Sequence, residues 1–393
     1  MKTADNSKMG EDFFKYLPSE IVVEILSRLP TRAAMACKCV CKPWLGLLAT
    51  PEFVNSHMSR SVLGIAVETR SLSYETIEFV DELDLNFDEE HLWDVTLSFR
   101  LPFDGPFRSS ANGVIFLRDF RRGDLILCNP ITRDYIKLPR PRLTPPKVPD
   151  ELDNFGFGVS RMTRQYKVVW IFSLVGHAQN PLLGTCSRNA CQVYTVGTGS
   201  WRNVPFGMPL RFIGDQGGVL FNGNLHWTVA KKRRGIDRWI CCFDLETEFF
   251  STFSAPRPHG RGFDFSRSLC VLRDCLCLSD ISKDGCVIIW LMKEDERSWT
   301  KIFVIPEIDR LSNNSGEKRL TGAIHIWPIR IFENGDALME WEDGPLFYYS
   351  NKRKFLDYTI MSLGDCDPFT RTIMYASSFV SLKSFVMENV YSF

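Results

Sequence analysis

Apolar residues recur at helical spacing from Ile21 to Leu29, directly after Pro18. Proline suits the first turn of a helix, because its missing N–H would have no partner there. The proline that follows Leu29 ends the stripe, since proline disfavours helical geometry in the residue before it. Two further short stripes follow, and Pro51 ends the last of them. The pattern predicts three helices within residues 14–60.

Beyond residue 60 the apolar residues form short runs separated by turn sequences. Runs such as Tyr166–Phe172 and Val287–Met292 are rich in β-branched and aromatic residues, which favour strands. Dipeptides that tolerate positive φ, such as Asn222-Gly223, stand between the runs. A phrase of a strand, a polar turn and an aromatic residue returns at spacings of roughly 50 to 65 residues, near the length of a kelch-type blade. We therefore expect a mostly β fold, a β-propeller-like domain of about six or seven blades, behind a small helical N-terminus.

Composition narrows the classes of function. The chain has 393 residues, and its 47 Lys and Arg balance its 47 Asp and Glu. Because no global basic field exists, we expect no nucleic-acid partner. The longest apolar run, Val168 to Val175, has the length of a strand, so we expect no membrane span. The polar first residues carry no apolar core of a secretory signal, and the expected location is the nucleus, the cytoplasm or both.

Clusters that could carry chemistry are better explained as structure. Cys37, Cys39 and Cys41 alternate, whereas zinc sites use Cys-x-x-Cys pairs with further ligands nearby. A cysteine nucleophile needs a histidine base and an orienting group, and the six histidines stand in no motif that supplies them. His226 is expected to fill a blade interior or a turn. We predict no catalytic residue, no metal and no cofactor on this chain.

The helical part, roughly 45 residues long, has more apolar positions than one small face can bury. A lone core is marginal at this size. Either these side chains are buried against the rest of the chain, or part of their surface waits for a partner chain. Periodicity alone does not decide between the two.

The same residues match a known motif in order. Leu17-Pro18, Ile21, Ile25-Leu26 and Leu29-Pro30, followed by Val40-Cys41-Lys42-x-Trp44 and Pro51-x-Phe53, resemble the F-box motif. The stretch 33–37 departs from it, because the family usually carries a bulkier leucine and a basic residue there.

The remainder is similar to the plant F-box-associated domain, which is related to kelch repeats. The phrases that carry the resemblance stand in family order: Asn112-Gly113 with Asn129-Pro130, Gly156-Phe157-Gly158, Val193-Tyr194 with Ser200-Trp201, Asn224-Leu225-His226-Trp227, Cys242-Phe243-Asp244 and Ile289-Trp290 with Ser298-Trp299. The resemblance implies an F-box at about 12–56 and a propeller-like domain at about 60–393.

The resemblance implies the substrate-recognition subunit of an SCF-type ubiquitin ligase. The F-box would dock on a Skp-type adaptor, and through it on cullin and RING subunits, while the propeller-like domain would hold an unknown target protein. Trp44 is the expected aromatic anchor. The positions that the resemblance assigns to the adaptor or to the small F-box core are Leu17, Pro18, Ile21, Ile25, Leu26, Leu29, Pro30, Val40, Cys41 and Trp44.

Two alternatives remain open: an F-box scaffold outside a complete ligase, and a β-propeller enzyme. The basic run Lys231–Arg234 could be a nuclear import signal or a solvated loop, and the loop is favoured. The candidate target-binding loops are 84–92, 141–154, 176–190, 229–238, 256–267 and 309–320.

Overall fold

Four helices begin the part of the chain that the structure, a computed structural model, describes. The described residues are 17–68, 73–79, 95–119, 121–141, 153–175, 187–213, 217–231, 238–257, 267–282, 286–293, 298–305, 326–341, 346–357 and 371–393. The helices are α1 (Ser19–Leu26), α2 (Thr31–Cys37), α3 (Lys42–Leu47) and α4 (Pro51–Arg60).

The fourth helix is one more than the sequence pattern predicts. Pro51 ends one helix and also begins the next, because it occupies the first turn of α4, where its missing N–H costs nothing. The hydroxyl of Thr50 caps this helix by accepting a hydrogen bond from the Phe53 N–H at 3.3 Å. Helical structure therefore continues to Arg60.

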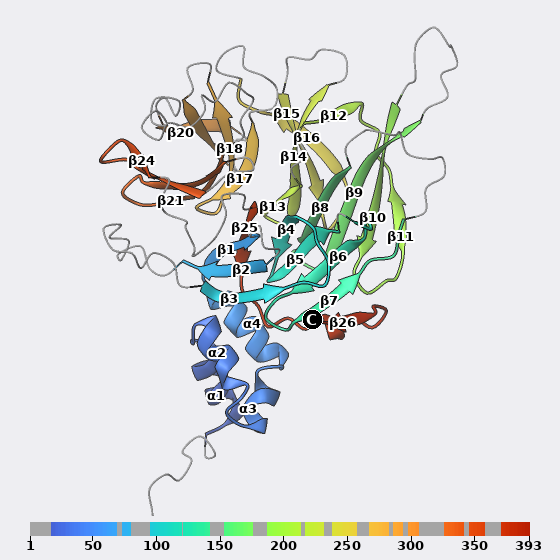
Figure 1. The fold of residues 1–393 in the computed structure, drawn as a ribbon. Coiled ribbons are helices and arrows are strands. Elements are labelled where there is room, and N and C mark those ends of the chain that lie inside the picture. Colours follow the sequence, from blue (N-terminus) through green and yellow to red (C-terminus); the bar gives the residue numbers. More distant parts are fainter. Residues whose placement is uncertain are drawn as a thin grey trace, which may run out of the picture.

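Six antiparallel sheets follow in the described residues, and they confirm the predicted propeller (Figure 1). Blade 1 contains β25 (Arg371–Ala376), β1 (Leu63–Glu68), β2 (Ser73–Glu78) and β3 (Val95–Arg100). Blade 2 contains β4 (Phe107–Ala111), β5 (Val114–Arg118), β6 (Leu125–Asn129), β7 (Asp134–Lys137) and β26 (Val390–Ser392). Blade 3 contains β8 (Asn154–Val159), β9 (Tyr166–Val175), β10 (Ser187–Thr195) and β11 (Trp201–Val204). Blade 4 contains β12 (Leu210–Phe212), β13 (Val219–Phe221), β14 (Asn224–Lys231), β15 (Arg238–Asp244) and β16 (Phe250–Ser254). Blade 5 contains β17 (Ser268–Leu272), β18 (Cys275–Ile281), β19 (Val287–Lys293) and β20 (Ser298–Ile305). Blade 6 contains β21 (Ile326–Ile331), β22 (Ala337–Trp341), β23 (Leu346–Ser350) and β24 (Phe355–Asp357).

Both ends of the propeller sequence build blade 1. β25 pairs antiparallel with β1, with Leu63 opposite Ala376 and Glu68 opposite Arg371. This pairing closes the ring, and it leaves β1 paired on both sides, with β25 and with β2.

Apolar side chains between adjacent blades form the core. Because each blade is covered on both faces, its inner strands are apolar on both faces, and every residue of β6 is buried. Gly156 of β8 and Gly218 form a parallel bridge beside the ring of Trp227. A Cβ at Gly156 would lie 2.7 Å from Trp227 Cζ2, so glycine permits the close approach of blades 3 and 4.

Strand direction defines two faces of the propeller. The near face carries the helices and the β6–β7 turn at residues 130–133, whose Ile131 packs against them. The two-residue turn of Asn222 (φ +54°) and Gly223 (φ +76°), a predicted hairpin signal, lies on the same face by strand direction. The strand ends that flank residues 142–152, 176–186 and 232–237 lie on the opposite, far face. These three segments take in much of the predicted target-binding loops and lie outside the described residues, as do 84–92, 309–320 and most of 256–267.

His226 in β14 fills the interior of blade 4, as expected, with Nδ1 3.4 Å from the Val219 carbonyl oxygen. Burial lowers the pKa of His226 from 6.5 to about 4. Between about pH 6.5 and pH 4, the unfolded chain binds a proton at this histidine that the folded chain does not. The free energy of unfolding therefore decreases as the pH is lowered through this range.

We predict that the free energy of unfolding of the wild type falls by about 2 kcal/mol more than that of His226→Gln when the pH is lowered from 7 to 5, because glutamine does not titrate in this range. Urea unfolding of both proteins at the two pH values measures this difference. Equal losses in the two proteins would show that His226 does not titrate with a lowered pKa.

Candidate functional site

The four helices share their hydrophobic core with the propeller. Val22, Leu26 and Phe53 are buried in this core together with Ile131 of the β6–β7 turn and Phe379 of the C-terminal segment. Helix α4 lies against the propeller, while α1 and α3 lie at the free end of the helical region (Figure 1). Apolar side chains of the helices are therefore partly buried within the chain and partly exposed, on different helical faces.

Helix α1 carries apolar residues on two faces. Val22 and Leu26, four residues apart, point into the core, and Leu26 is only 1% exposed. Ile21 and Ile25, also four residues apart, are 47% and 40% exposed. A helix that only covered the core would keep polar residues at the second pair of positions, so the exposed pair forms a separate apolar surface.

Further exposed apolar side chains come from the α2–α3 turn and from α3. Val40 is 62% exposed and Leu45 is 50% exposed. We call Ile21, Ile25, Val40 and Leu45 the exposed helical surface. Leu45 was not among the predicted site residues, although its place next to Trp44 on a short apolar helix could have indicated it.

The predicted adaptor-binding residues divide by burial. Pro18, Ile21, Ile25, Pro30 and Val40 are exposed. Leu17, Leu29, Cys41 and Trp44 are partly exposed, and Leu26 belongs to the helical core. Their contact with an adaptor stays a prediction.

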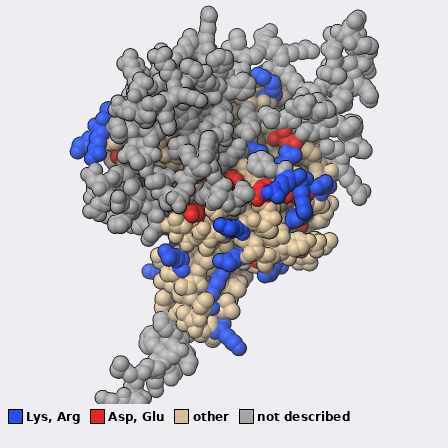
Figure 2. Space-filling model, in the orientation of Figure 1, with Lys and Arg blue, Asp and Glu red and all other residues tan. Residues whose placement is uncertain are grey.

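An ion-pair network ties α1 to α4 beside this core. Glu24 accepts hydrogen bonds from Arg28 at 2.6 Å and from Arg60 at 2.9 Å. The Arg28 hydrogen bond, against the opposing effect of desolvation and with help from Arg60, holds the pKa of the partly exposed Glu24 carboxyl below its ordinary value. Arg60 also donates to the Ser27 hydroxyl at 2.7 Å. The visible face of the helical region is mostly uncharged, crossed by several Lys and Arg side chains (Figure 2).

Cys37 packs against the helical core as a small apolar residue. Burial raises the pKa of the Cys37 thiol, which disfavours the thiolate that binds metals. Among the described residues no group of three or more His, Cys, Asp or Glu could hold a metal ion. No helix in the described part of the chain is long and apolar enough to cross a membrane.

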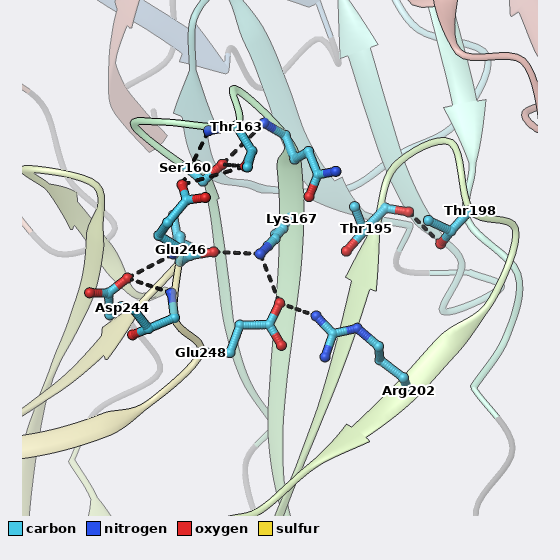
Figure 3. Close-up of polar contacts among 12 residues, drawn as sticks. Ser160, Thr163, Lys167, Thr195, Thr198, Arg202, Asp244, Glu246 and Glu248 are labelled. Carbon is cyan, nitrogen blue, oxygen red and sulfur yellow. Dashed lines mark hydrogen bonds and ion pairs between the residues drawn. The ribbon is translucent and has the colours of Figure 1, made fainter.

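A polar cluster on the near face joins blades 3 and 4 (Figure 3). Lys167 of β9 is buried and lies 2.7 Å from Glu248 Oε1, which Arg202 also contacts. Burial alone raises the pKa of Glu248, but the hydrogen bonds from Arg202 and Lys167 outweigh it and hold that pKa below its ordinary value. Glu246 accepts from the backbone N–H groups of Met162 and Thr163 at 3.2 Å each. Lys167 and Arg202 of blade 3 thus meet Glu248 of blade 4, and the cluster connects the two blades.

Comparison with known proteins identifies both regions. Residues 109–324 match the family described as "F-box associated beta propeller domain", and residues 14–56 match the F-box-like family. The Arabidopsis thaliana F-box protein At3g07870 is 27% identical over 87% of this chain and 87% of its own length. The A. thaliana F-box protein CPR1 is 28% identical over 74% of this chain and 73% of its own. A six-bladed fungal lectin of solved structure, 8% identical, covers 60% of this chain and 69% of its own with a TM-score of 0.34, which says nothing about function.

Two neighbouring residues of α1 test the division between core and surface. We predict that Leu26→Ala lowers the free energy of unfolding by about 2–5 kcal/mol, because it leaves a cavity among buried side chains. Ile25→Ala should cost less than about 1 kcal/mol, because its side chain is partly in water already. Chemical denaturation of the two variants measures both values, and similar losses would contradict the division.

Proposed function

The chain belongs to the family with an F-box associated beta propeller domain, and from this premise we propose that it is the substrate-recognition subunit of an SCF-type ubiquitin ligase. In this proposal the F-box binds a Skp-type adaptor, which connects it to cullin and RING subunits. The propeller holds a target protein, and no catalytic step takes place on this chain.

The observation that carries the proposal is the exposed helical surface. Its four apolar side chains are between 40% and 62% exposed and come from α1, from α3 and from the α2–α3 turn. Helices α1 and α3 lie at the end of the helical region away from the propeller (Figure 1). Monomeric proteins rarely gather large apolar side chains at the tip of a small domain, and such surfaces mark sites of protein association. A Skp-type adaptor is the partner that the F-box-like match supports.

The ligase role follows from proximity. A target lysine held near an activated ubiquitin thioester reacts at a high effective concentration, provided that one rigid body spans both. The helices occupy the near face, whereas the far-face strand ends flank residues 142–152, 176–186 and 232–237, which take in much of the predicted recognition loops. We therefore propose the far face as the target-binding side.

Location stays a prediction of nucleus, cytoplasm or both. Residues 232–234 of the basic run Lys231–Arg234 lie outside the described residues. Lys231 ends β14 on the far face, and the sequence favours a solvated loop over an import signal there.

Removal of the exposed helical surface should break adaptor binding. The triple variant Ile21→Ala/Ile25→Ala/Val40→Ala should lose at least about 2 kcal/mol of binding free energy, about a 30-fold increase in Kd, because apolar anchors carry most of an interface's energy. Leu17→Ala/Pro18→Ala should act in the same direction. Titration calorimetry with a purified Skp-type adaptor measures both.

The matched control is Met162→Ala/Phe249→Ala. It removes two apolar side chains that are even more exposed but lie on the propeller, so it should bind the adaptor like the wild type. Undiminished binding by the triple variant would overturn the proposed site. An adaptor complex that fails to recruit cullin would instead favour the scaffold outside a complete ligase.

A further inference from the structure

The C-terminal segment, residues 377–393, connects the helices to three blades. It leaves the end of β25 in blade 1, passes along the near face and ends as β26, which adds an outer strand to blade 2 (Figure 1). None of the motifs that resemble known families lies in this segment.

One side chain of the segment enters the helical core. The ring of Phe379 is 3% exposed. It packs edge-on against the rings of Phe53 and His57, both on α4, with distances between ring centres of 5.2 Å and 5.0 Å. The Nζ of Lys38, at the end of α2, lies 4.8 Å from the centre of the same ring. Phe379 therefore contacts two helices and belongs to neither.

Buried hydrogen bonds hold the backbone on both sides of this ring. The amide of Asn129, at the end of β6, donates to the carbonyl oxygens of Ser378 at 2.9 Å and Val380 at 2.7 Å. Its oxygen accepts from the Ile131 N–H at 2.9 Å and so orients the turn that also enters the core. The Ser61 hydroxyl, directly after α4, donates to the Ser377 carbonyl oxygen at 2.8 Å.

The rest of the segment is anchored to blades 2 and 3. Asp134 of β7 accepts a hydrogen bond from the Ser392 hydroxyl and pairs with Lys383, at 3.1 Å each. Glu388 accepts from the Tyr194 hydroxyl at 2.6 Å and from the Gly197 N–H at 2.7 Å. Because the anchors lie on the propeller, Phe379 has a fixed position against which the helices pack.

We infer that Phe379 is a positioning residue that fixes the orientation of the helices, and hence of the exposed helical surface, relative to the propeller. Only a short link, residues 61–62, joins α4 to β1. A covalent link alone permits rotation, whereas a buried ring in contact with α4 and the end of α2 defines one orientation. The ring contacts of Phe379 are with α4 and the end of α2, so it acts through the helices that it holds.

The importance of this orientation for ubiquitin transfer rests on the proposed function. A target on the far face can meet the rest of a ligase at a defined distance only if the joint between the helices and the propeller is rigid. The rigidity itself can be measured on the full chain without any partner.

The test compares two phenylalanines of the same segment. Phe379→Ala removes the ring at the joint. Phe385→Ala removes an equal ring that packs on Tyr166 of blade 3, at 5.7 Å, away from the helices. Both variants carry a donor and an acceptor dye at exposed positions 20 and 301, introduced as non-natural amino acids, and time-resolved energy transfer reports the distribution of distances between helices and propeller.

We expect one narrow distribution for the wild type and for Phe385→Ala, and a clearly broadened one for Phe379→Ala. Amide hydrogen exchange in α1 and α4 should accelerate by about 100-fold in Phe379→Ala, with blades 3 to 5 unchanged. An unaltered distance distribution in a folded Phe379→Ala protein would overturn the inference. If that variant does not fold, the milder Phe379→Leu must show an intermediate broadening, and wild-type behaviour in it would equally overturn the inference.

Adaptor titration separates this inference from the proposed function. The adaptor surface is intact in Phe379→Ala, so its Kd for a Skp-type adaptor should stay within about tenfold of the wild type. If the wild type itself binds no adaptor, the proposed function fails while the distance measurement still decides the role of Phe379. If adaptor binding holds and the distances do not change, only the positioning role fails.

Discussion

Burial of a shared apolar core between the helices and the propeller is the interaction on which the rest of the structure depends. The helices cannot satisfy their own apolar side chains, because a unit of this size has too little interior. Ile131 and Phe379 complete that interior from the propeller side. Once the core is complete, the second apolar face of α1, with Ile21 and Ile25, has no place left inside the chain and remains at the surface. The proposed adaptor site is thus a consequence of how the core is filled.

Closure of the ring depends on segments that are remote in sequence. β25 joins β1 in blade 1, and β26 completes blade 2 next to it. The short strands of a propeller are individually weak, and antiparallel pairing within each blade together with apolar packing between blades makes them stable. Ion pairs such as that of Lys167 with Glu248 add directional contacts between two neighbouring blades. The propeller therefore supports the helices on its near face, and the proposed target-binding side is the opposite face.

Much of this architecture could be predicted from the sequence, because local patterns encode it. Helical spacing from Ile21 to Leu29 and the Asn222-Gly223 turn identified a helical start and a β-rich remainder, which the structure confirms. Periodicity could not reveal which apolar face of α1 is buried, since Ile25 and Leu26 are chemically alike and only tertiary contacts separate them. Phe379 was missed for the same reason: its partners, Phe53 and His57, lie more than 300 residues away along the chain.

Dependence of the helical core on Phe379 also orders events during synthesis. The helices are synthesised before the propeller, yet their interior lacks one wall until Phe379, more than 300 residues after α4, has been translated. A nascent or prematurely terminated chain therefore presents an unfinished N-terminal domain to quality control. The core of the helices is therefore complete only after the strands of the six described blades, through β25, have been made.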